Sequence, residues 1–466
     1  MDTLRAAIAQ GGILVPGDDG YEDSIKRWSS AAEKRAAVIV KPTNAEEVSA
    51  AIKFAVTNKI PLTASGGRHS SSGASSSEGM VIDLSKMRSV SVDQDAMTVS
   101  FDGGCLWEDI EKILDPLGLA TVGGVVNHTG VGGLVLGGGH GYLSPKHGLS
   151  IDNLISAQVV TADGSVLEAS EGENQDLFWA IRGAGAQFGI VTRFTMSVHK
   201  QGQVWSGLFA YTADKLPDLV AAANDFHDRD NRDGHCMTIA IGYGPDGSSH
   251  LLMVNPFYDG PEEDGRKFFS KLLEAGPVVE KTKMMSVGEV TQLLNPLLYH
   301  GIRRLMGSAN IVMPIDAAAL QQTADKFWAF CDANPDAAGR SALAIELFPM
   351  HKVCEVGQDA TAYSNRGNYY DVITLFGWTD PALDGEMRSF NRAMLAHTRD
   401  NMGYKYDQSK GGGGAAPVGR YINLEADPVK PEDAYGANLD RLRELKNRYD
   451  PGNVFHKWHG VNLEVE

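Results

Sequence analysis

Six glycines crowd into the ten residues from Gly130 to Gly139, and this run limits what the 466-residue chain can fold into. Such a composition disfavours a stable surface helix, because each glycine costs up to about 1 kcal/mol relative to alanine. Val131 and Leu134–Leu136 interrupt the run with core-forming residues, so it does not read as a flexible linker. A dinucleotide-binding fingerprint also fits poorly, because no strand-to-helix unit follows. Bare backbone at this density instead predicts close approach to a large planar or anionic group.

A second Gly/Ser-rich segment, residues 65–73, follows a predicted strand over 61–64. Upstream, the pattern predicts a strand over 37–43 and an amphipathic helix over 45–56 that is capped by Asn44. A turn of this composition after a strand exposes consecutive backbone N–H groups. The segment is therefore expected to wrap a diphosphate without help from a cation.

Two further segments complete a series. Residues 174–194 read as a short helix, a glycine turn and a strand, and residues 435–455 contain an amphipathic helix that ends before Pro451. In this order the four segments resemble the flavin-binding blocks of the berberine-bridge-enzyme-like branch of the vanillyl-alcohol-oxidase flavoprotein superfamily. The resemblance covers most of residues 37–200 and 415–460, and its details are most similar to fungal members.

The resemblance implies FAD as cofactor, with His69 bonded to the 8α-methyl group of the flavin. Doubly linked relatives carry a cysteine where this chain has Val126, so a single covalent bond and no cysteinyl bond is expected. Thr129 stands at the family's oxygen-gate position, and its modest size favours reaction with O₂. Arg68 replaces the usual glycine, and it is strained if that backbone needs a positive φ. Trp458 stands where relatives often have asparagine, so the pyrimidine edge of the flavin is expected to be held differently.

The residues expected to contact the cofactor lie in these blocks and at the return of the chain. They are Ser65, Gly66, Gly67, Arg68, His69, Ser70, Gly73, Val126, Thr129, Gly130, Gly132, Gly133, Gly138, Gly139, His140, Gly141, Ile190, Tyr421, Asn423 and Trp458.

Between residues 205 and 410 the glycine blocks stop, and predicted strands alternate with long helices. The strands are expected over 237–241, 251–254, 342–348 and 370–378, and the helices over 261–274 and 316–332. The fold class is therefore α+β. By resemblance it is a two-subdomain PCMH-type FAD-binding domain plus an antiparallel-sheet substrate domain with helices on its outer face. The expected boundaries are 1–204 and 411–466 for the FAD-binding domain and 205–410 for the substrate domain.

Three residues are candidates for catalysis: Tyr421, Glu346 and Tyr142. Tyr421 falls on a predicted return strand over 419–424, where Leu424 replaces a second tyrosine of the family. Ionising a free phenol at pH 7 costs roughly 4 kcal/mol, so Tyr421 needs a helper. The helper is either Arg420, by its charge, or Glu346, by accepting the proton. Tyr421 and Glu346 are expected to act as a hydrogen-bonded pair and not as two independent bases, because an ionised Glu346 alone would oppose a tyrosinate.

Charge and cysteine usage limit the partners. The net charge of −17 disfavours nucleic acid and anionic membranes. The four cysteines have no metal-ligand spacing, so no metal is expected. No apolar run is long enough to span a bilayer, and the N-terminus does not resemble a secretory signal, which predicts a cytoplasmic enzyme. The oligomeric state is open.

The expected function is that of an FAD-dependent oxidase of secondary metabolism. It transfers a hydride from a small organic substrate, phenolic, polyketide or alkaloid-like, to covalently bound FAD and then to O₂, giving H₂O₂. The alternatives are a flavoprotein cyclase of the Diels–Alderase type, a sugar or alcohol oxidase, and a flavoprotein that only binds its ligand. Fold alone does not decide among them.

Overall fold

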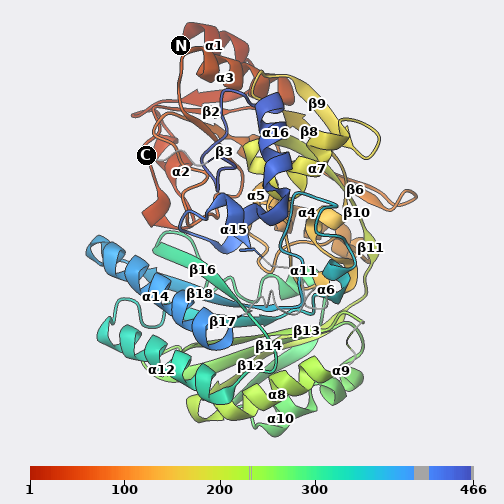
Figure 1. The fold of residues 1–466 in the computed structure, drawn as a ribbon, viewed down its shortest axis with the longest axis vertical. Helices are drawn as coiled ribbons and strands as arrows, with labels where there is room; N and C mark the ends of the chain where they lie inside the picture. The colour runs from red at the N-terminus through yellow and green to blue at the C-terminus, as the bar shows by residue number, and fades with distance from the viewer. Residues whose placement is uncertain (230, 232, 404–418, 463–466) are drawn as a thin grey trace.

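The computed structural model describes residues 1–229, 231, 233–403 and 419–462. The chain forms one part that contains both the N-terminal half and the C-terminal segment, and a second part built on a seven-stranded sheet (Figure 1). The α+β class expected from the sequence is confirmed. The domain boundaries themselves stay predictions.

A four-stranded sheet opens the fold, in the order β1-β2-β4-β3, with β2 and β3 parallel to β4. The predicted helix is present as α3 (Ala45–Thr57), and the Asn44 side chain caps it by accepting from the backbone of Glu47. The apolar face of α3 is buried, as its spacing predicts. The other elements here are α1 (Asp2–Ala7), β1 (Gly12–Leu14), α2 (Tyr21–Ile25), β2 (Val38–Lys41), β3 (Leu62–Ser65) and β4 (Met80–Asp83).

An antiparallel five-stranded sheet follows, in the order β5-β6-β10-β8-β9. Its strands are β5 (Val90–Asp93), β6 (Thr98–Asp102), β8 (Leu154–Val160), β9 (Val166–Ser170) and β10 (Ile190–Ser197). Around it lie α4 (Trp107–Leu114), α5 (Val131–Leu136), α6 (Ser144–His147), α7 (Gln175–Ala184) and the small pair β7 (Leu119–Ala120) and β11 (His199–Lys200).

The glycine run holds a short helix, which its composition disfavoured. α5 covers Val131–Leu136, and Val131, Val135 and Leu136 are buried in the core. Tertiary packing of these apolar residues outweighs the poor helix propensity of the two glycines between them.

The second part is a fully antiparallel sheet in the order β15-β12-β14-β13-β17-β18-β16. The long helices cover its outer face, as expected, and its inner face turns to the first part (Figure 1). The helix expected over 261–274 is broken at Phe269 into two. The strands are β12 (Val204–Thr212), β13 (Cys236–Tyr243), β14 (His250–Tyr258), β15 (Val279–Met285), β16 (Arg303–Ile311), β17 (Ala342–Leu347) and β18 (Tyr370–Trp378). The helices are α8 (Leu216–Asp228), α9 (Glu262–Phe268), α10 (Ser270–Glu274), α11 (Val287–Val290), α12 (Ala317–Ala333), α13 (His351–Cys354) and α14 (Asp384–Met402).

The chain then returns to its N-terminal half. The strand expected over 419–424 is wrong: Ile422–Leu424 is a 3-10 turn, closed by the Leu424 amide donating to the Tyr421 carbonyl at 3.1 Å. Two short helices follow, α15 (Pro431–Tyr435) and α16 (Leu439–Tyr449), and α16 packs against α7 (Figure 1). Within the described ranges, no helix is long and apolar enough to cross a bilayer.

One partly buried acid joins the two parts. Glu111 on α4 accepts a hydrogen bond from Thr291 Oγ1 at 2.9 Å, just after α11. Burial raises the pKa of Glu111 to about 8; the bond from Thr291 lowers it, and the charges of Asp115 and Glu108 add to the rise. The carboxyl is therefore protonated in the folded protein at neutral pH.

We predict that Glu111→Gln makes the protein more stable than wild type at high pH. The unfolded carboxyl ionises near pH 4.5 and the folded one near 8, so wild-type stability falls between these values and the variant escapes that loss. The difference should reach roughly 5 kcal/mol by pH 9 in urea unfolding. Glu274→Gln, at an exposed site on α10, is the control. A stability difference that is independent of pH would contradict the prediction.

Candidate active site

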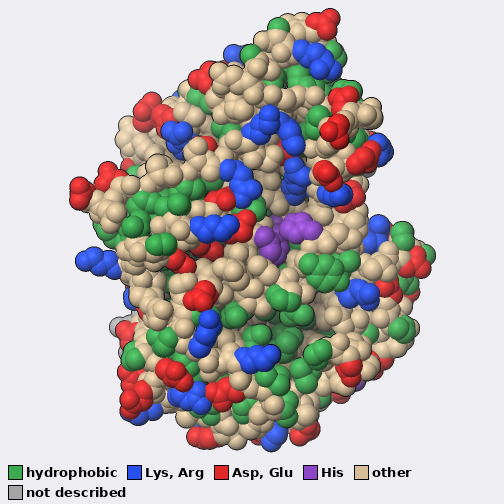
Figure 2. Space-filling model, turned by 180° about the vertical axis from the view of Figure 1, so that it is seen from behind, with side chains coloured by type: hydrophobic (Ala, Val, Ile, Leu, Met, Phe, Trp, Pro, Cys, Tyr) green, Lys and Arg blue, Asp and Glu red, His purple; other side chains and the backbone are tan. Residues whose placement is uncertain are grey.

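A pocket of about 420 Å³ lies between the inner face of the seven-stranded sheet and the Gly/Ser-rich segments of the first part. Figure 2 shows histidine side chains gathered near the middle of the rear face, above a cluster of hydrophobic side chains. The pocket collects most of the residues expected from the sequence. Those that line it are Gly66, Gly67, Arg68, His69, Ser70, Val126, Thr129, Gly130, Gly132, Gly133, His140, Tyr142, Ile190, Glu346, Tyr421, Asn423 and Trp458.

Ser65, Gly73, Gly138, Gly139 and Gly141 were also expected at the cofactor, but they are not among the lining residues. Three of these glycines permit close packing instead. A Cβ on Gly138 would lie 2.6 Å from the ring of Tyr363, one on Gly139 2.4 Å from Ser150 Oγ, and one on Gly141 2.2 Å from the carbonyl of Gly123. Gly73 and Ser65 lie at the far end and the start of the His69 loop, and the buried Ser65 Oγ has no partner among the described residues.

The glycine segments form a cradle with open backbone. Gly67 and Gly130 touch: a Cβ on Gly67 would lie 2.2 Å from the nitrogen of Gly130, and one on Gly130 2.3 Å from the nitrogen of Gly67. Gly133 on α5 faces open space, with nothing within 4 Å of its Cβ position. The Ser75 hydroxyl and His69 Nε2, which belong to pocket-lining residues, are buried without partners among the described residues. Bare backbone and unpaired polar atoms along one cavity fit a large cofactor with a diphosphate.

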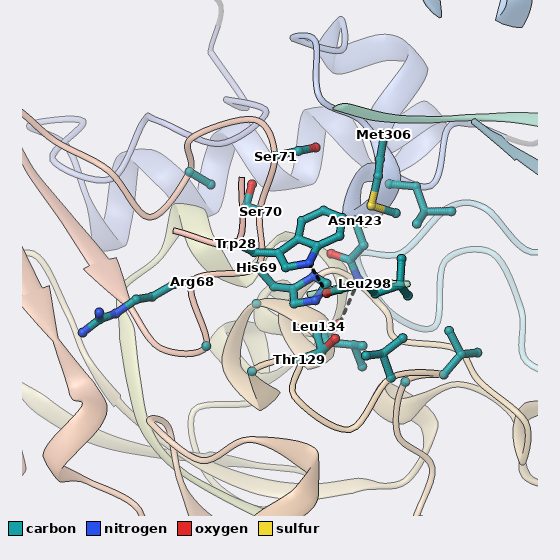
Figure 3. Close-up of a pocket in the computed structure, with 18 of the residues that line it drawn as sticks. Trp28, Arg68, His69, Ser70, Ser71, Thr129, Leu134, Leu298, Met306 and Asn423 are labelled. Carbon is teal, nitrogen blue, oxygen red and sulfur yellow. Dashed lines mark hydrogen bonds between the residues drawn. The ribbon is translucent and has the colours of Figure 1, made fainter. Parts of the chain in front are cut away.

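His69 is held rigidly at this cradle. The Trp28 ring stacks on its imidazole with centroids 4.3 Å apart, and the ring of His128 lies 5.0 Å away (Figure 3). Trp28 is itself fixed, because its Nε1 donates to the Leu298 carbonyl at 2.7 Å. His69 Nε2 is buried without a partner among the described residues.

Burial lowers the pKa of His69 well below its ordinary value, and the charges of His128, His300 and Arg304 lower it further. The imidazole is therefore neutral at physiological pH. A neutral ring nitrogen with a free lone pair is the state in which a histidine acts as a nucleophile.

Arg68 has the backbone conformation that its replacement of glycine made a concern. Its φ is +60°, in the left-handed region. The side chain points away from His69 (Figure 3). It donates to the fully buried Asp83 at 2.6 Å and to the Asp23 carbonyl at 3.0 Å. These contacts hold the loop in a conformation that arginine alone disfavours.

On the sheet side, Glu346 pairs with His140 and not with Tyr421 as expected. His140 Nε2 lies 2.8 Å from Glu346 Oε2, and both side chains are under one-tenth exposed. The Tyr421 ring stacks on His140 at 4.7 Å, and its hydroxyl accepts from Asn423 Nδ2 at 2.9 Å. The pairing differs because His140, on the loop after Gly139, places its imidazole next to the carboxylate. A sequence reading could not place these two residues, which are 206 positions apart.

The protonation states separate the three catalytic candidates. Burial alone would lower the pKa of His140, but the hydrogen bond and charge of Glu346 and the charge of Asp371 raise it overall. Burial raises the pKa of Tyr421 and of Tyr142 well above the ordinary phenol value, so both stay protonated. The Tyr142 hydroxyl donates to Asn255 Oδ1 at 2.8 Å. The Glu346–His140 pair is therefore the group suited to exchange a proton near neutral pH.

The roof of the pocket is mostly apolar. Its strands place alternate residues on this face, which is why Ala342, Ala344 and Glu346 share it. The apolar lining residues of the roof and its flanking loop are Leu208, Ala240, Met253, Leu294, Leu297, Leu298, Met306, Ala342, Ala344, Ile373, Leu375 and Leu424. Alternation along the strands could have predicted this set from the sequence. Trp28 lies in no sequence motif, so its place in the site could not be predicted.

Comparison with known proteins agrees with this site. A family model for an FAD binding domain matches residues 36–170, and one described as berberine and berberine-like matches residues 420–462. The FAD-linked oxidoreductase pgmH of Aspergillus terreus is 38% identical over 98% of this chain and 95% of its own length. The chain therefore belongs to the family of berberine-bridge-enzyme-like, FAD-linked oxidoreductases. The FAD-linked oxidoreductase OXR1 of Pyricularia oryzae is 32% identical, over 99% of this chain and 92% of its own.

Solved structures share the fold of this FAD-linked oxidoreductase. The 6-hydroxy-D-nicotine oxidase of Arthrobacter nicotinovorans superposes with a TM-score of 0.82 at 24% identity, covering 98% of each chain. Glucooligosaccharide oxidase of Acremonium strictum, which holds a 6-S-cysteinyl, 8α-N1-histidyl FAD, superposes with a TM-score of 0.83 at 22% identity, covering 99% of each chain. At the position expected for such a cysteine, this chain has Val126 in the pocket wall.

We predict that Arg68→Ala destabilises the enzyme by about 2 kcal/mol, because Asp83 loses its close partner and keeps only Lys41 at 3.7 Å. Arg68→Gly loses the same ion pair but relieves the strain of a positive φ, so it should be about 1 kcal/mol more stable than Arg68→Ala. Urea unfolding of the three proteins measures both differences. An alanine variant at least as stable as the glycine variant would show that the backbone is not strained.

Proposed function

We propose that this oxidoreductase is an oxidase that removes a hydride and a proton from a small, largely apolar organic substrate and passes the electrons to O₂, giving H₂O₂. We further propose that FAD is bonded through its 8α-methyl group to His69. One observation carries the proposal: a single pocket joins the neutral His69 and the glycine cradle to the buried Glu346–His140 pair. Thr129 lines the same pocket, and its modest size supports access of O₂.

Each residue of the site has a separate role in this reaction. Bound FAD supplies the hydride acceptor. The Glu346–His140 pair takes the proton of the substrate O–H or N–H, while the electron pair of that bond becomes the second bond of the C=O or C=N product. Tyr421, which stays protonated, donates a hydrogen bond to the substrate, and Asn423 orients its hydroxyl. Removal of the proton near the hydride donor is what the buried position of the pair provides.

The lining supports a phenolic, polyketide or alkaloid-like substrate over a sugar. A sugar carries several hydroxyls, and each one buried without a partner costs free energy. The roof offers mostly methyl and methylene groups, with polar atoms from Thr238, Tyr243, Asn255, Arg340 and Ser341 and at the Glu346–His140 pair. A substrate with one oxidisable polar group and an apolar body satisfies this surface.

Leu424 favours one second candidate. Leucine has no ionisable group, and it stands where the family has a tyrosine. Its presence favours a flavoprotein cyclase, because a cyclase needs less acid–base chemistry than an oxidase. Product isomeric with substrate, with no peroxide, would identify that function.

For the covalent bond, we predict that flavin stays with the protein after acid precipitation, and that His69→Ala releases it to the supernatant. The alanine variant has no ring nitrogen to form the bond. His456→Ala is the matched control, because this histidine lines the same pocket. Absorbance of pellet and supernatant gives the distribution. Wild-type flavin in the supernatant, or flavin retained by His69→Ala, would overturn the assignment.

For the reaction, we predict that aromatic alcohols reduce the flavin anaerobically, that cellobiose does not, and that air then yields peroxide. Glu346→Gln keeps a hydrogen-bonding partner for His140 but removes the negative charge, so the reduction rate should fall by about 10²–10⁴. Glu355→Gln, at an exposed site, is the control. Rapid reduction by cellobiose, or an unchanged rate in Glu346→Gln, would contradict the proposal.

A further inference from the structure

We propose that Asp371 is a proton store for the Glu346–His140 pair: its buried carboxyl group keeps the substrate's proton inside the protein until O₂ is reduced. This inference rests on the proposed oxidase function. Asp371 is not among the residues that line the pocket, so it acts through Glu346 and not on the substrate.

The sheet register places the two carboxyl groups side by side. Glu346 on β17 is directly opposite Asp371 on β18, and the next pair, Ala344 and Ile373, lines the pocket. Residues two apart on a strand share a face, so Glu346 and Asp371 both lie on the pocket side. Directly opposite side chains start from Cβ atoms about 5 Å apart. The second carboxyl therefore lies immediately behind the first.

The contacts of Asp371 do not explain why an acid is buried at this position. It is 2% exposed, and no lysine or arginine among the described residues forms an ion pair with it. Asn310 Nδ2 donates a hydrogen bond to Asp371 Oδ1 at 3.2 Å. A buried carboxylate without a cation is unfavourable, and two adjacent carboxylates cannot readily both ionise. The pair therefore readily takes up one proton, and the position of that proton depends on its neighbours.

The neighbouring groups bring the pKa of Asp371 close to neutral pH. Burial raises the pKa of Asp371 to about 7; the charge of His140 opposes this rise, and those of Glu346 and Glu425 add to it. The phenols of Tyr363, Tyr369 and Tyr421 also face this group, and burial keeps them protonated by raising each pKa. Exchange is thus confined to His140 and the three carboxyl groups.

The third carboxyl group is that of Glu425, which is 6% exposed and whose charge acts on Asp371. Burial raises the pKa of Glu425, while Arg420 and Arg399, at 4.0 and 3.8 Å, lower it. The charges of Arg399 and Arg420 oppose this rise, and negative charge on Glu425 favours the protonated form of Asp371.

Storing the substrate's proton balances the protons taken up and released in the whole reaction. The substrate loses a hydride, which reduces the flavin, and a proton, which the Glu346–His140 pair takes. Formation of H₂O₂ from O₂ consumes one hydride equivalent and one proton. A proton kept at Asp371 is therefore available for the second half of the cycle, and no net proton needs to cross the protein surface.

The resting holoenzyme provides a first test that needs no substrate. Infrared spectra between pH 5 and 9 record the C=O stretch of protonated carboxyl groups. Because partly buried Glu111 contributes to the same region, the comparison is made in the Glu111→Gln background. We expect a band that is lost with a midpoint near pH 7 and is absent after Asp371→Asn, which preserves the shape of the protonated acid. A band that survives Asp371→Asn, or no band in this pH range, would overturn the proposal.

The second test is the release of protons during anaerobic reduction by an aromatic alcohol, followed with a pH indicator dye. Wild type at pH 8, where resting Asp371 is ionised and the negative charge of the reduced flavin raises its pKa, should release almost none, and Asp371→Asn should release about one proton for each flavin reduced. In wild type alone, release should rise as the pH falls through 7, because Asp371 is then already protonated before reduction. One proton released by both proteins at every pH would overturn storage. No flavin reduction by any alcohol would instead reject the oxidase function and leave the infrared result standing.

Discussion

The contact between the backbones of Gly67 and Gly130 is the constraint on which the site depends. A methyl group at either position would overlap the other chain segment, so only glycine permits the approach. The contact brings the His69 loop against the loop that carries Val126 and Thr129. It thereby sets the floor of the pocket, above which the seven-stranded sheet places Glu346.

Burial of the groups around this floor determines their protonation states. The same exclusion of water that keeps His69 neutral keeps Tyr421 protonated, and it forces the acids on the roof to share protons. The net result is a division between a neutral nucleophile at one end of the pocket and an acid–imidazole pair at the other. A mostly apolar roof between them leaves few polar contacts for a substrate.

Local patterns predicted the fold well because they record local physics. The capped helix α3, the glycine cradle and the strands of the roof were visible as caps, composition and alternation. The 3-10 turn at Ile422–Leu424 was missed because Tyr421 and Asn423 both meet the cradle, an effect of packing and not of strand propensity. The His140–Glu346 bond was missed because two segments distant in sequence create it. Asp371 drew no attention because a lone acid in an apolar strand has meaning only through its register.

The crystal structure of the flavin-loaded enzyme tests the central claim most directly. We expect continuous density between a ring nitrogen of His69 and the 8α carbon of the flavin, with the ring system in the pocket under Glu346 and His140. Density for an unattached flavin, or a ring system turned away from Glu346 and His140, would contradict it.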